Sequence, residues 1–281
     1  MFRRRDRIEV KTAEQLQVMR RAGLVVAATL QALTEAAAPG VTTAELDQLA
    51  RDQLAAAGAT SSFLHYGQPP FPGVICASVN DEVVHGIPGD RVLRDGDLLS
   101  VDFGAIVDGW HGDAAVSIAV GTLSDEVARL SHVTEESLWA GLAQALAGGR
   151  LSDVGHAVEA TVRRLEPAPG AYGILSDYVG HGIGSAMHMD PAVPNYGAPG
   201  RGPTLLPGMA LAVEPMVVAG PKDVYVDDDD WTVRTDQGAV AAHWEHTVAI
   251  TEDGPWVLTA LDGGAARFAA LGVPSPAAHA D

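Results

Sequence analysis

The chain has 281 residues, of which 47% are hydrophobic, and a formal net charge of −18 at pH 7. This length suits one large domain or two small ones and allows a sizeable core. We expect neither nucleic acid nor an anionic membrane as a direct partner, because an acidic surface repels both. The single cysteine, Cys76, excludes an intrachain disulfide and fits a reducing compartment.

The N-terminal segment is basic, but no uninterrupted apolar segment follows it directly. Residues 22–38 are rich in alanine and are interrupted by Gln31, Thr34 and Glu35. This pattern favours an amphipathic helix over a signal peptide or a membrane span. We therefore expect a cytoplasmic protein.

Two helices are predicted before the first strands. Thr12 and Gln15 have the spacing of a capping box and precede an apolar-periodic run. Thr42 and Glu45 repeat this spacing before a second run, which closes at Gly58. A short strand and an alternating hairpin follow.

The same order returns in the second half of the chain. Ser124 is expected to cap a helix that runs towards Ala147, and Ser152 a helix that ends near Leu165. Strand-rich sequence follows again. The doubled order of helix, helix and strands predicts an α+β fold with two similar halves around one sheet and helices on one face.

The end of the chain differs in composition. Residues 263–281 are rich in Ala, Gly and Pro, and we expect them to form a mobile tail. Residues 1–262 are then expected to form a single catalytic domain. Within it, "MALAVEPMVV" (209–218) and "AAHWEHTVAI" (241–250) are each predicted to be one strand.

The stretch "SVDFGAIVDGWHGDAA" predicts a hairpin that turns at Asp108-Gly109. In this register Asp102 and Asp113 are diagonal neighbours on one face, roughly 7–8 Å apart. Two carboxylates held close in an apolar setting need protons, arginines or metal ions. The alternative is that both are exposed at the edge of a sheet, where water would solvate them.

Three more polar residues lie in similar settings. His181 stands in the glycine loop "VGHGIG", and Glu214 and Glu245 stand inside apolar strands. A core histidine or a buried ion pair could explain each residue alone. Together with the two aspartates they form an oxygen-rich ligand set, which can hold two divalent ions about 3.5–4 Å apart. Cys76 alone is more typical of packing than of a nucleophile.

At this point the chain resembles the type I methionine aminopeptidases in their minimal form, which has no N-terminal zinc-finger extension. The motifs "SVNDEVVHGIPG", "VDFGAIVDGWHGDAAVS", "GHGIG", "VEPMV", "DWTV" and "WEHTV" carry the resemblance over about residues 10–262. It implies the pita-bread fold and a metallo-hydrolase that removes the initiator methionine from nascent proteins, preferably before a small residue. It also implies that a hydroxide bridging two divalent ions (Mn, Fe, Co or Zn) attacks the scissile carbonyl.

The resemblance also assigns roles to individual residues, matched motif by motif. The implied metal ligands are Asp102, Asp113, His181, Glu214 and Glu245, of which Asp113 and Glu245 would bridge both ions. The implied catalytic residues are His85, His188 and Glu214, and the first two would also contact substrate. The implied pocket for the methionine side chain contains Phe71, Cys76, Met187 and Trp231.

Two other classes of function compete with this one. An Xaa-Pro peptidase shares the ligand order but normally carries a separate N-terminal domain. A non-catalytic binding protein could keep the fold without metals, although such proteins lose ligands first. We expect a monomer that acts on nascent chains beginning with Met, and only weak contact with the ribosome, because the net charge opposes rRNA.

Overall fold

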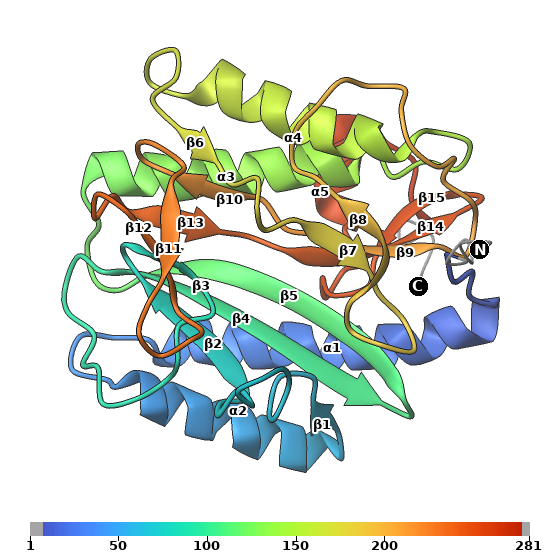
Figure 1. The fold of residues 1–281 in the computed structure, drawn as a ribbon. Helices are drawn as coiled ribbons and strands as arrows, with labels where there is room; N and C mark the ends of the chain where they lie inside the picture. The colour runs from blue at the N-terminus through green and yellow to red at the C-terminus, as the bar shows by residue number, and fades with distance from the viewer. Residues whose placement is uncertain (1–7, 277–281) are drawn as a thin grey trace, which may run out of the picture.

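The computed structural model describes residues 8–276. Two helix pairs are each followed by strands, which confirms the predicted helix–helix–strand doubling (Figure 1). The first half contains α1 (Ala13–Ala36), α2 (Thr43–Ala57), β1 (Thr60–Ser61), β2 (Ile75–Val79), β3 (Glu82–Val84), β4 (Leu98–Val107) and β5 (Trp110–Ala119). The second half begins with α3 (Asp125–Leu142), α4 (Leu151–Leu165), β6 (Gly173–Ile174), β7 (Gly180–Gly182) and β8 (Met189–Val193). It continues with β9 (Ala210–Val213), β10 (Met216–Val218), β11 (Val224–Val226), β12 (Val233–Thr235), β13 (Ala241–His243), β14 (His246–Thr251), β15 (Gly254–Val257) and α5 (Ala265–Leu271).

The first two helices begin where the sequence predicts. The hydroxyl of Thr12 accepts a hydrogen bond from the backbone N–H of Gln15, whose side chain accepts from the N–H of Thr12. Thr42 and Glu45 form the same reciprocal pair at the start of α2. Each box satisfies donors that a helix N-terminus leaves free.

The boundaries of the second pair differ from the prediction. Helix α3 ends at Leu142 rather than near Ala147, because the chain tightens there into a turn with hydrogen bonds to carbonyls three residues back. Helix α4 is capped at Arg150, not at Ser152. The Asp153 carboxylate accepts the Arg150 N–H at 2.9 Å, so the acidic side chain at the third helical position fixes the start.

The two long strands predicted in the second half are each broken once. Residues 209–218 form β9 and β10, which Glu214 and Pro215 separate. Residues 241–250 form β13 and the first part of β14, separated at residues 244–245. Because β10 pairs with β13 and β9 pairs with β14, the two breaks face each other. Proline has no N–H for a sheet ladder, which accounts for the first break.

The described strands form four sheets rather than the single predicted sheet. Strands β1, β4, β2 and β5 form one sheet, and β15, β14, β9, β7 and β8 form another. Two three-stranded sheets, β13-β10-β6 and β11-β12-β3, complete the set. In the β4–β5 hairpin, Asp102 pairs with Ala115 and Asp113 with Gly104, which confirms the predicted register.

A short seam, formed by residues 113–117 and 243–247, joins the two halves. The backbones of Ala115 and Glu245 exchange two hydrogen bonds, at 2.9 and 3.3 Å. Beside them, the Thr247 hydroxyl accepts from the Asp113 N–H and donates to the Asp113 carbonyl. The seam therefore brings residues that are more than a hundred positions apart in the sequence side by side.

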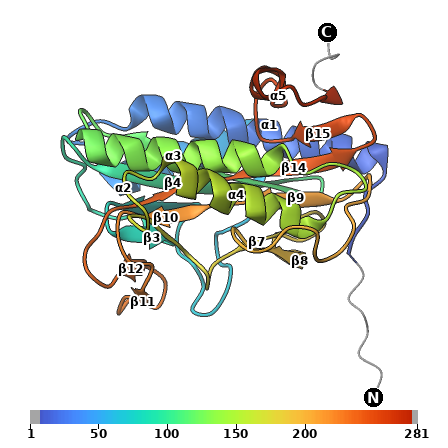
Figure 2. The ribbon, with the colours of Figure 1, turned by 90° about the horizontal axis from the view of Figure 1, so that it is seen from above.

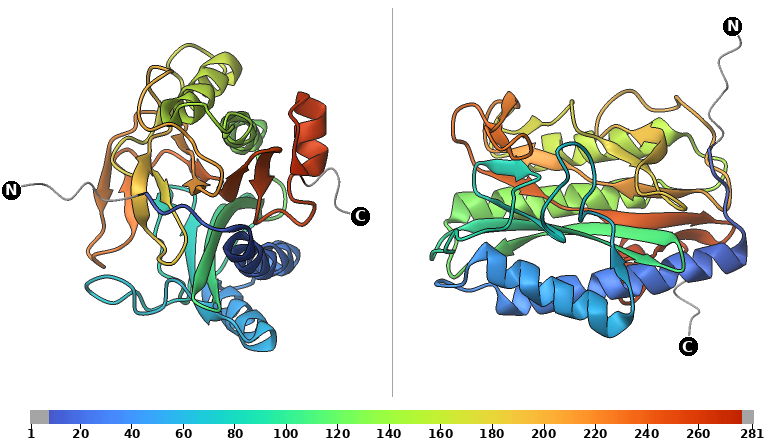
Figure 3. Two further views of the ribbon diagram at one scale, coloured as in Figure 1. Left: turned by 90° about the vertical axis from the view of Figure 1, so that its right-hand side faces the viewer. Right: turned by 60° about the horizontal axis from the view of Figure 1, so that its bottom comes forward.

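The helices cover one face of the strands. Figure 2 shows α1 and α3 along this face, with the β7–β8 and β11–β12 hairpins on the other. Figure 3 shows the α1–α2 pair beside the strands of the first half and the α3–α4 pair beside the strands of the second half. Separate apolar clusters lie under each pair, one around Leu33 and Phe103 and one around Leu142 and Leu211. No helix within residues 8–276 is long and apolar enough to cross a membrane.

The structure differs from the expected mobile tail at residues 263–276. Helix α5 packs into the second core, where Phe268 is fully buried. Arg267 bonds to the Glu136 carboxylate at 2.6 Å and stacks over the Trp139 ring. The expectation relied on the many small residues in this segment, whereas Phe268 and Arg267 hold it against the core. Residues 277–281 lie outside the described part of the chain.

We expect Phe268→Ala to lower the free energy of unfolding by about 3–5 kcal/mol, because it empties a fully buried site. Urea unfolding of the full-length chain would measure this loss. Leu271→Ala is the matched control, since Leu271 lies on the same helix and is 49% exposed. Equal, small effects of both substitutions would contradict the docking of α5.

Candidate metal centre

A single pocket is lined by all eleven residues that the sequence analysis singled out. Carboxylates and histidines lie together with apolar side chains around it. The lining residues are Phe63, Tyr66, Phe71, Cys76, His85, Asp102, Asp113, His181, Met187, His188, Glu214, Trp231 and Glu245. The hairpin alone left open whether the two aspartates are exposed at an edge, and the structure places them in this pocket instead.

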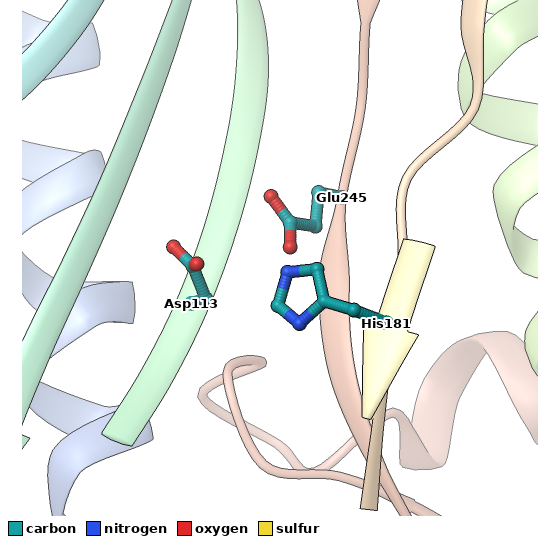
Figure 4. Close-up of side chains that lie close together, drawn as sticks. All are labelled: Asp113, His181 and Glu245. Carbon is teal, nitrogen blue, oxygen red and sulfur yellow. The ribbon is translucent and has the colours of Figure 1, made fainter. Parts of the chain in front are cut away.

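Three of these side chains converge on one point. Asp113 on β5, His181 on β7 and Glu245 at the β13–β14 break each offer a ligand atom within 4.8 Å of the others. Figure 4 shows both carboxylates and the imidazole pointing toward one another. All three residues are buried, so water cannot fully solvate these groups.

The carboxylates of this pocket have buried oxygen atoms without a hydrogen-bond partner. These atoms are Asp102 Oδ1, Asp113 Oδ1 and Glu245 Oε1. Within residues 8–276, no ion pair from Lys or Arg reaches the four pocket carboxylates. A buried anion without a cationic partner is costly, so this donor set fits divalent cations.

Burial raises the pKa of all four carboxyl groups. It raises the pKa of Asp113 to about 7. Burial and then the neighbouring Asp113 charge raise the pKa of Asp102, Glu214 and Glu245 well above their usual range. Without cations, the pocket therefore retains protons at a pH where carboxyl groups are normally ionised.

His181 is oriented as a metal-binding histidine would be. Its Nδ1 donates to the Gly182 carbonyl at 3.0 Å, and its Nε2 lies 3.5 Å from Glu214 Oε1. Burial lowers its pKa to about 4, so the ring is neutral and Nε2 carries a free lone pair. Glycine is required at position 180, because a Cβ there would strike the Ala212 carbonyl of β9.

His85 and His188 also line the pocket. Burial lowers the pKa of His85 to about 4 and lowers the pKa of His188 below its usual value. Both rings are therefore neutral near pH 7, and each can donate one N–H. His85 has a φ of 62°, a backbone conformation that residues other than glycine rarely adopt. Such strain is typical of functional sites.

The apolar part of the pocket includes Phe63, Phe71, Cys76 and Met187, with Trp231 packed against them. The rings of Phe71 and Trp231 meet edge to face, with their centroids 5.2 Å apart. Burial raises the pKa of the Cys76 thiol, so Cys76 is a packing residue and not a thiolate nucleophile. The pocket therefore has an acidic end and an apolar end.

Sequence reasoning missed three residues of this region. Phe63 and Tyr66 line the pocket, and His243 Nε2 lies 3.9 Å from Glu214 and 4.0 Å from Glu245. His243 precedes Glu245 by two positions, so strand alternation would have put both on one face. Tyr66 lies in an irregular loop with no periodic signal.

The sequence is similar to that of known metallopeptidases. The model of metallopeptidase family M24 matches residues 17–252. The chain is 52% identical over 260 residues to methionine aminopeptidase 1 of Mycobacterium tuberculosis, covering 92% of this chain and 97% of the relative. It is 50% identical to the methionine aminopeptidase of Clostridium acetobutylicum, covering 90% and 98%.

Solved structures show the same relation. The methionine aminopeptidase of Thermotoga maritima superposes with a TM-score of 0.86 at 39% identity, covering 90% of this chain and all of that one. A prolidase from Pyrococcus furiosus shares the fold alone, with a TM-score of 0.69 at 20% identity. The match covers 65% of the prolidase chain and 89% of this chain.

The fold and the buried ligand set define a metallopeptidase of the pita-bread class. The chain belongs to metallopeptidase family M24 and, within it, to the methionine aminopeptidases.

We expect the stability of the metal-free protein to fall as the pH rises from 5 to 7, and Asp113→Asn to make this fall shallower. The unfolded chain releases the Asp113 proton near pH 3.9, whereas the folded chain holds it to about pH 7. Between these values the folded state binds the extra proton, so stability falls with rising pH by on the order of 1 kcal/mol per pH unit for one such group.

Urea unfolding with chelator at pH 5, 6 and 7 would measure the slope. Asp108→Asn is the matched control, because Asp108 is exposed at the turn of the same hairpin. Identical slopes for wild type and Asp113→Asn would contradict the proton-retaining pocket.

Proposed function

We propose that this chain is an aminopeptidase that removes methionine from the N-terminus of peptides and nascent proteins, preferably before a small residue. The observation that carries the proposal is the two-ended pocket. Its apolar end, between Phe71, Cys76, Met187 and Trp231, suits an unbranched thioether side chain. Its acidic end suits divalent cations and, beside them, the free N-terminal amine of the substrate.

We further propose that two divalent ions bind at the acidic end. The ligands would be Asp102, Asp113, His181, Glu214 and Glu245. Asp113 and Glu245 are proposed to contact both ions, because each carboxylate has two oxygens. Oxygen ligands with one imidazole suit Mn, Fe, Co or Zn. When bound, such ions lower the pKa of water and polarise a carbonyl group.

The side chains around these ions would then bind substrate and move protons. His85 is proposed to donate to the scissile amide and assist the leaving amine, and His188 to donate to the carbonyl oxygen as negative charge develops there. Both are suited to this, because their lowered pKa keeps them neutral near pH 7. Glu214 is proposed to accept a proton from the attacking water and to pass it to the leaving amine.

We propose that the enzyme acts in the cytoplasm as a monomer, where nascent chains emerge. The net charge of −18 opposes rRNA, so any contact with the ribosome would be weak. An Xaa-Pro peptidase is the alternative from the same fold class. It is less favoured, because the prolidase structure is 20% identical to this chain and the methionine aminopeptidase structure 39%.

We expect the chelated protein to release no methionine from a Met-Ala-Ser peptide, and activity to return when Mn, Co, Fe or Zn is added. Asp113→Asn and Glu245→Gln should each lower kcat/KM by about a hundredfold or more, since loss of an outer-shell partner alone can have this effect. Chromatographic detection of free methionine would measure both.

Asp108→Asn again serves as the control and should keep full activity, because its carboxylate pairs with Arg21 at the surface. Cleavage of Xaa-Pro peptides without cleavage of Met-Ala would establish the alternative. A folded protein that binds no metal and cleaves neither peptide would point to the non-catalytic class.

A further inference from the structure

A contact that the proposed chemistry does not use joins the pocket loop to His188. The Tyr66 hydroxyl lies 2.7 Å from His188 Nδ1, and the two rings meet edge to face at 5.3 Å. Tyr66 is 42% exposed, so this contact lies at the rim of the pocket. The other ring nitrogen, Nε2, has no hydrogen-bond partner among residues 8–276.

Acid strength decides which group donates. A phenol has a pKa near 10, whereas a neutral imidazole N–H is a far weaker acid. A neutral imidazole carries its proton on one nitrogen and a lone pair on the other, so one ring nitrogen of neutral His188 is an acceptor. The Tyr66 hydroxyl therefore donates to Nδ1, and the ring proton is left on Nε2.

The loop holds Tyr66 in place despite its exposure. The His65 N–H donates to the Phe71 carbonyl, and the Phe71 N–H donates to the Tyr66 carbonyl, both at 2.8 Å. The Trp231 indole N–H donates to the Pro69 carbonyl at 3.1 Å. These bonds tie the loop to itself and to the pocket wall, so they hold the backbone of Tyr66 at the rim of the pocket.

We propose that Tyr66 is a positioning residue that fixes the tautomer of His188. By occupying Nδ1, it leaves the proton on Nε2, from which His188 donates to the carbonyl oxygen of the bond being cut. A His188 with the opposite tautomer would present a lone pair to that oxygen and repel it. The expected effect on the reaction rate rests on the proposed function. The assignment of the His188 tautomer does not depend on it.

We expect Tyr66→Phe to lower kcat about tenfold, as the loss of one hydrogen bond would, and to leave KM within about twofold. In a His188→Gln background the same change should have no further effect, because no tautomer remains to be fixed. Tyr196→Phe is the matched control and should keep wild-type rates. Tyr196 is 38% exposed, and its hydroxyl contacts the Ser176 carbonyl away from the pocket.

The tautomer can be observed without substrate or metal. Nitrogen-15 NMR of histidine-labelled, metal-free protein should show one neutral His188 ring protonated at Nε2, assigned by the signal that His188→Gln removes. Tyr66→Phe should convert it to a mixture of tautomers. A wild-type ring protonated at Nδ1, or spectra unchanged in Tyr66→Phe, would overturn the proposal.

The two proposals fail in different ways. Equal losses from Tyr66→Phe with and without His188 would also overturn the positioning role, because the effect would then not pass through His188. A wild-type protein that releases no methionine would contradict the proposed function alone, since the spectra still decide the tautomer.

Discussion

The structure depends on how four carboxylates are held in one buried pocket. Their mutual repulsion and their loss of water oppose folding unless protons or cations compensate. The described lysines and arginines form their ion pairs elsewhere, so compensation must come from bound protons or from metal ions. The paired strand breaks release Glu214 and Glu245 from the sheet ladder. On either side of His181, Gly180 allows close approach to β9 and Gly182 allows close approach to β8.

Neither half of the chain contains the pocket by itself. Of the proposed ligands, Asp102 and Asp113 come from the first half, and His181, Glu214 and Glu245 come from the second. The backbone hydrogen bonds between Ala115 and Glu245 join the two halves at the seam. The seam therefore serves both the packing of the halves and the geometry of the site, and a change that separates the halves would also dismantle the donor set.

Local rules predicted the parts of the fold that depend on neighbouring residues. The capping boxes at Thr12 and Thr42 and the register around Asp108-Gly109 follow from short-range chemistry and were correct. Tertiary packing determines the strand breaks, the division into four sheets and the docking of Phe268. The alternation of residues and the composition therefore do not predict these features. The buried carboxylates were found because such residues are unusual in apolar strands, whereas the other pocket residues were assigned through the resemblance to a known family. Tyr66 was missed because an irregular loop has no period.

The buried carboxylates and His181 are proposed to form a centre for two divalent ions. Anomalous diffraction from crystals grown with Mn²⁺ would test it most directly, since the signal locates each ion without reference to activity. We expect two peaks in the pocket, with Asp113 and Glu245 in contact with both. A single peak would contradict the second ion, and no peak at these residues would contradict the account as a whole.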